Sequence, residues 1–148
     1  MILRQALVCW ALATAPSTFA GQIVDLATYP DAFHVQSMQL QDGIAAEIIS
    51  CDVNGDGLTD LLLAATIADG VNFSRGAAGE IWLVLGARKR WSGTRSIQDV
   101  AAVRIIGQQE FHSFGASVAC ADLNSDGFAD IAGGTTQADS LNNTRDQA

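Results

Sequence analysis

The sequence predicts an all-β fold of about two antiparallel, four-stranded units, and three observations carry this prediction. Short apolar runs alternate with Gly, Asp, Asn and Ser, as in chains of strands and tight turns. No segment after residue 20 has convincing helical periodicity. A nine-residue loop and its flanks recur 70 residues apart. The 148 residues, 49% of them hydrophobic, suit one domain with a packed core.

Residues 1–20 have the features of a secretory signal peptide. Arg4 precedes an apolar run over residues 6–13, and a small-residue cleavage pattern ends at Ala20. The run is shorter than the roughly 20 residues that span a bilayer, so we expect cleavage and no stable membrane insertion. The mature chain is then residues 21–148, and its location is secreted, either extracellular or periplasmic.

The first repeat covers about residues 42–107 and holds about four strands, the content of one propeller blade. The predicted strands are 44–49, 61–67, 80–85 and 102–106, preceded by a half-buried strand at 33–40. The basic run Arg88, Lys89 and Arg90 is interpreted as a solvated loop rather than an anion patch, and it starts a polar stretch that reaches about Asp99. Trp82 and Phe128 are expected to fill a core between strands.

The recurring loop runs from Asp52 to Asp60 and again from Asp122 to Asp130, with the pattern D-h-N-x-D-G-h-x-D, where h is apolar. Apolar segments precede and follow both copies in the same register. One such loop could arise by chance in an acidic chain, whereas two with matching flanks indicate a true repeat. The second repeat, residues 112–148, is incomplete.

Alternate positions of each loop offer oxygen ligands, which suits calcium. Ca²⁺ takes six to eight oxygens, whereas Mg²⁺ prefers a smaller octahedral shell and Zn²⁺ prefers His and Cys. The expected ligands, with Leu58 and Phe128 acting through backbone carbonyls, are Asp52, Asn54, Asp56, Leu58 and Asp60, and Asp122, Asn124, Asp126, Phe128 and Asp130. We expect about two structural Ca²⁺ ions.

Two alternatives to this calcium site fit the sequence less well. An EF-hand loop needs a bidentate acid at its twelfth position, where this chain has Leu63 and Gly133. Ion-free Asp/Gly turns would leave three carboxylates in each loop without a compensating charge, at a Coulombic cost. The calcium interpretation is therefore favoured over both.

Composition and motifs also exclude several functions. The 16 acidic and 8 basic residues give a net charge of -8, which argues against sequence-independent binding to nucleic acid or anionic lipid. No Ser/His/Asp order or nucleophile elbow is present, and we expect no enzymatic activity. Cys51 and Cys120 remain after signal cleavage, and their pairing as a disulfide or persistence as two buried thiols stays open.

These residues resemble the FG-GAP repeat of integrin α-chain propellers and many bacterial secreted proteins. Phe114–Gly115 matches the FG element, 122–130 the calcium loop and 133–135 the GAP element, with Thr135 in place of Pro. In the first copy Ile44–Ala45 and 64–66 take these places, so its loop is the faithful part. The resemblance implies propeller blades with Ca²⁺ in the hairpin between their first two strands.

The expected function is that of a secreted, calcium-binding propeller segment of bacterial type, acting as a scaffold or as an adhesion-like module for a protein or cell-surface glycan. One alternative is the non-catalytic propeller portion of a larger extracellular enzyme that acts on polysaccharides or phospholipids. Another is an adhesion protein that completes its propeller by oligomerising, because propellers close with about 4–8 blades and this chain holds fewer than two.

Overall fold

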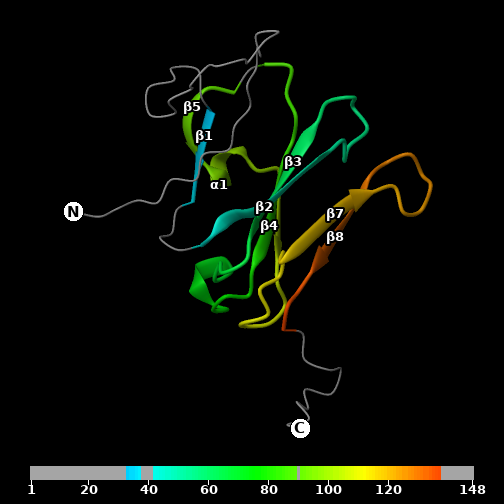
Figure 1. The fold of residues 1–148 in the computed structure, drawn as a ribbon. Coiled ribbons are helices and arrows are strands. Elements are labelled where there is room, and N and C mark those ends of the chain that lie inside the picture. The colour runs from blue at the N-terminus through cyan, green and yellow to red at the C-terminus, as the bar shows by residue number, and fades with distance from the viewer. Residues whose placement is uncertain (1–32, 38–41, 90, 138–148) are drawn as a thin grey trace, which may run out of the picture.

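The computed structural model describes residues 33–37, 42–89 and 91–137. The predicted signal peptide, residues 1–20, lies outside these residues. The chain forms an all-β fold, shown in Figure 1. Its strands are β1 (Phe33–Gln36), β2 (Ile44–Cys51), β3 (Asp60–Ala65), β4 (Glu80–Val84), β5 (Gly93–Ser96), β6 (Val103–Ile106), β7 (Ser117–Ala121) and β8 (Asp130–Gly134). A 3-10 turn, η1 (Val71–Phe73), and one helical turn, α1 (Ile97–Val100), complete the elements.

The first repeat forms one complete blade. Its sheet has the order β2-β3-β4-β6 with every neighbouring pair antiparallel, and β7 and β8 form a separate antiparallel pair. Four strands in meander order are the content of a propeller blade, and the second pair corresponds to the first two strands of the next blade. The described residues therefore form a partial β-propeller, as the sequence predicts.

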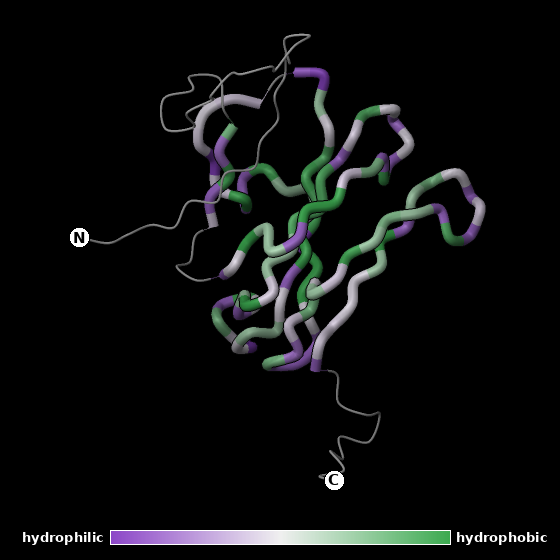
Figure 2. The backbone as a smooth tube through the Cα atoms, in the orientation of Figure 1, coloured by the Kyte–Doolittle hydropathy of each residue, from purple (hydrophilic) through white to green (hydrophobic). Residues whose placement is uncertain are grey.

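The blade is covered on both faces, which explains why β3 and β4 are almost continuously apolar. One face presents Leu62, Ile81 and Leu83 to Val118 of β7. The opposite face presents Leu63, Trp82 and Val84 to Phe33, Val35 and Ile97 of β1 and α1. Figure 2 shows the resulting apolar centre between more polar loops.

The covering layer on the second face differs from the prediction. The polar stretch that follows the basic run contains β5 and α1, which the sequence did not predict, and β5 pairs with β1 in parallel, with Val35 opposite Arg95. The sequence of β5, Gly-Thr-Arg-Ser, has no alternation of apolar and polar residues. Three of its four residues are exposed, so the strand is held by backbone pairing and does not need apolar side chains. Ile97 is the apolar residue that could have indicated a buried position in this polar stretch, since it is 1% exposed and inserts into the core from α1.

The four-stranded sheet and the β7-β8 pair are joined covalently by a disulfide between Cys51 at the end of β2 and Cys120 in β7. Their Cα atoms lie 6.4 Å apart. A second link is the Glu47 carboxylate, whose Oε2 accepts a hydrogen bond of 2.7 Å from the Val118 N–H. The disulfide settles the pairing that the sequence leaves open.

Candidate metal-binding loops

The two predicted loops are the hairpin turns between β2 and β3 and between β7 and β8. In the first, Asp52 Oδ1 accepts from the N–H of Gly55 at 2.8 Å, and its Oδ2 accepts from the N–H of Gly57 at 2.8 Å. Asp56 Oδ1 accepts from the N–H of Leu58, also at 2.8 Å. The Asp carboxylates therefore stabilise the turn by accepting hydrogen bonds from backbone N–H groups of the loop, the local role for which Asp is favoured in turns.

The second loop repeats this arrangement. Asp122 Oδ2 accepts from the N–H of Gly127 at 2.9 Å, and Asp126 Oδ1 accepts from the N–H of Phe128 at 2.9 Å. In both loops the Asn amide donates to the middle Asp at 3.0 Å. Six hydrogen bonds of the first loop recur at positions 70 residues later. The repeat in sequence is therefore a repeat in geometry.

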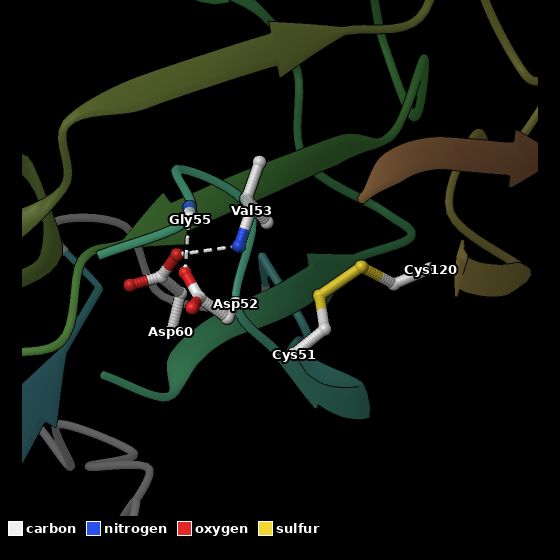
Figure 3. Close-up of a disulfide and its surroundings, with 6 residues drawn as sticks. All are labelled: Cys51, Asp52, Val53, Gly55, Asp60 and Cys120. Carbon is white, nitrogen blue, oxygen red and sulfur yellow. Dashed lines mark hydrogen bonds between the residues drawn. A yellow bond between two sulfur atoms is a disulfide. The ribbon is translucent and has the colours of Figure 1, made fainter. Parts of the chain in front are cut away.

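The last acidic residue of each loop is placed differently in the two copies. Asp60 is 0% exposed; its Oδ2 accepts from the Val53 N–H at 2.8 Å and its Oδ1 from the Gly86 N–H at 2.6 Å. Figure 3 shows the Asp60 side chain, from the start of β3, beside Asp52 and Val53 of the loop that follows Cys51. Asp130 is half-buried, and its Oδ2 accepts from Leu123 N–H at 2.9 Å. Asp60 thus also anchors the end of β4.

The two loops touch through a contact that the loop sequences do not predict. A Cβ built on Gly55 would lie 2.9 Å from the Phe128 ring, and Gly55 has a φ of 71°. The expectation that Phe128 fills a core is wrong, since 51% of the residue is exposed while Trp82 is 6% exposed as expected. Phe128 lies instead over the neighbouring loop, where only Gly leaves room for it.

A metal ion would have to use side chains that already hold backbone hydrogen bonds. Within the described part of the chain, no three His, Cys, Asp or Glu side chains are grouped so as to hold a metal. The donor set nevertheless fits a hard cation, because each loop supplies three carboxylates and an amide, and a carboxylate has about four lone-pair sites. No described Lys or Arg forms an ion pair with these carboxylates; the pair within the described residues is Arg104 with Glu80.

The glycines and aromatic residues that flank the second loop also make a specific contact. A Cβ on Gly133 would lie 2.6 Å from the ring of Phe114, so the ring packs directly on the glycine backbone. Phe114 and Gly133 belong to the FG and GAP elements of the second repeat. The packing of the Phe114 ring on Gly133 therefore explains why a glycine occurs at this position of the repeat.

A model of the FG-GAP repeat family matches residues 47–84 and 114–148. This chain is an FG-GAP repeat protein. The first match covers most of β2 together with β3 and β4, and the second begins at Phe114. No curated protein matches the chain.

FG-GAP repeats are typically non-catalytic propeller modules and are typical of extracellular proteins. None of the helices in the described segments has the length and apolar character needed to cross a membrane.

Proposed function

We propose that this FG-GAP protein is a secreted, calcium-stabilised propeller scaffold that presents its surface to a protein or glycan partner. The observation that carries the proposal is the recurrence of the acidic loop, with six of its hydrogen bonds repeated 70 residues later. We infer about two structural Ca²⁺ ions, one for each loop. Their ligands would be Asp52, Asn54, Asp56, Leu58 and Asp60 in the first loop, and Asp122, Asn124, Asp126, Phe128 and Asp130 in the second.

Charge supports a cation in these loops. Asp52 and Asp56 lie within five residues on a turn whose tip, residues 54–57, is exposed, and no basic side chain in the described residues neutralises them. Like charges at such spacing repel in the folded state. A divalent cation held by hard oxygens relieves this repulsion and adds favourable coordination, so its binding favours the folded loop.

The position of the loops supports a structural role for the ion. Loop 52–59 joins the first two strands of its blade, begins directly after disulfide-bonded Cys51, and contacts Phe128 of the other loop. An ion there would order a hairpin turn and the junction between two blades. Nothing in this role requires a substrate at the metal.

Secretion is supported by two features besides the predicted signal over residues 1–20. The Cys51–Cys120 disulfide suits an oxidising compartment, where such bonds persist. The family itself is typical of extracellular proteins. The alternative, a non-catalytic portion of a larger extracellular enzyme, uses the same fold and loops. A hydrolase screen on the purified chain addresses it: calcium-independent turnover would contradict a purely scaffolding role.

Thermal unfolding in EDTA and in Ca²⁺ tests the proposed ions. At a free Ca²⁺ concentration of 100 times Kd, each site adds about 2.7 kcal/mol to the free energy of unfolding, and Tm rises accordingly. Asp56→Ala should lose about half of this increase. Glu110→Ala is the matched control, because it removes one exposed negative charge away from both loops and should keep the full increase. An unchanged Tm at millimolar Ca²⁺ would contradict the proposal.

A further inference from the structure

The positive charges of this acidic protein are concentrated in one segment. Four of its 8 Lys and Arg residues lie in residues 88–95, and no acidic residue occurs between Glu80 and Asp99. The net charge of the whole chain is -8. The segment therefore carries a local positive field against a negative background, which favours anions at this place and disfavours long polyanions elsewhere.

Several described residues of this segment line a hollow of about 390 Å³, a volume within the range of small-ligand sites. Among the described residues, the hollow is lined by Ala87, Lys89, Trp91, Ser92 and Arg95. Two cations, one hydroxyl and one indole thus face a common space. This combination offers charge pairing, hydrogen bonding and an apolar platform at once.

Trp91 is held as a platform by the layer beneath it. Its ring stacks on Phe33, with the centroids 5.4 Å apart and the planes at 28°. Phe33 is 5% exposed and belongs to the core, while Trp91 remains 37% exposed. One face of the indole is therefore backed by a fixed side chain, and the remaining surface is open to a ligand.

Arg95 is positioned by backbone pairing. It lies in β5 opposite Val35 of β1, and Val35 is 2% exposed. The exposed guanidinium can therefore approach a ligand from a strand anchored to the core. A planar guanidinium binds carboxylate or sulfate groups through two parallel hydrogen bonds, and Lys89 adds a second positive charge.

We propose that this hollow binds an acidic saccharide, with a sugar ring on Trp91 and its carboxylate or sulfate group between Lys89 and Arg95. The C–H groups on one face of a pyranose ring are apolar and match an exposed indole, while Ser92 can hydrogen-bond a ring hydroxyl. The inference deepens the interaction role proposed above by naming a ligand class. It does not depend on calcium.

Calorimetric titration of the full chain with tetragalacturonate tests the site, and the methyl-esterified tetramer is the matched neutral ligand. We expect the ester to bind roughly fivefold more weakly or worse, because it cannot form the ion pairs. Trp91→Ala should weaken binding about tenfold or more, as for other exposed aromatic anchors. Lys89→Gln and Arg95→Gln should each weaken it about three- to fivefold.

Arg88→Gln is the control variant, because Arg88 belongs to the same basic run and is exposed but does not line the hollow. It should leave the Kd unchanged. Trp91→Phe keeps an aromatic surface on Phe33 and should bind within about threefold of the parent, so the test survives if Trp91→Ala fails to fold. Circular dichroism checks the folding of each variant.

Several results would overturn the proposal. They are no binding of tetragalacturonate at millimolar concentration, an equal loss in Arg88→Gln and Arg95→Gln, equal affinity for inorganic phosphate, or tighter binding of a short single-stranded oligonucleotide. The titration is repeated in EDTA and in Ca²⁺. Failure of the calcium proposal would appear as an unchanged Tm with saccharide binding intact, and failure of this site as a normal calcium response without saccharide binding.

Discussion

The loops of the two repeats have the same pattern and nearly the same hydrogen bonds, but their surroundings differ. Asp60 is 0% exposed and its carboxylate reaches the backbone of Gly86 beyond β4, whereas Asp130 is half-buried and the described residues place no third strand beside β8. Gly55 lies under Phe128, whereas Ser125 takes the corresponding place in the second loop with a φ of 63°. A loop sequence therefore encodes the turn, and the rest of the blade determines what each residue contributes to stability.

The largest difference between the repeats is expected at the final Asp of each loop. Asp60→Ala removes two hydrogen bonds to a charged acceptor at a buried site and should lower the free energy of unfolding by about 3–5 kcal/mol. Asp130→Ala removes one and should cost about 1 kcal/mol. Urea unfolding in EDTA measures both without any contribution from bound calcium.

Asp60→Asn serves as the conservative control, because its amide oxygen keeps one acceptor and should restore part of the loss. Equal losses for Asp60→Ala and Asp130→Ala would show that the packing around the two loops does not distinguish them.

This comparison also shows what the sequence could predict. The apolar runs at 61–67 and 80–85 lie close to β3 and β4, because strands buried on both faces are almost continuously apolar. The run at 102–106 lies close to β6, the partly exposed last strand of the blade. The loops and the FG and GAP positions could be predicted because a turn depends on its own residues. The family match and the all-β fold confirm the predicted repeat family and fold class.

Features that depend on distant residues could not be predicted. The pairing of Cys51 with Cys120 depends on how the β7-β8 pair packs against the four-stranded sheet, which the sequence does not specify. The four residues of β5 have no apolar pattern, since the parallel partner β1 binds them through the backbone. The position of Phe128 over Gly55 likewise depends on how the second pair of strands packs on the blade.

The second prediction removes the covalent link between the repeats. Replacing Cys51 and Cys120 together by Ala releases a loop with a sequence separation of 69 residues and should cost about 2–4 kcal/mol, because the unfolded chain regains conformational freedom. Unfolding of the parent under reducing conditions should match the double variant. A loss well below 1 kcal/mol would mean that the interface between β2 and β7 is held by packing and by Glu47 alone.

The smallest effect is expected from the contact between the loops. Gly55→Ala combines a positive φ with a clash against Phe128 and should cost about 2 kcal/mol, whereas Gly57→Ala has a φ of 79° with open space and should cost about 1 kcal/mol. In a Phe128→Ala background the two Gly variants should become equal. If their difference persists there, the ring is not what makes Gly55 necessary.

The count of bound Ca²⁺ ions, measured by equilibrium dialysis, tests the calcium proposal most directly. The parent should bind about two ions, Asp56→Ala and Asp126→Ala about one each, and the double variant none, because each loop supplies its own oxygen ligands. Glu110→Ala should keep both. An absence of binding at millimolar Ca²⁺, or two ions retained by both single variants, would contradict the assignment of these loops as metal sites.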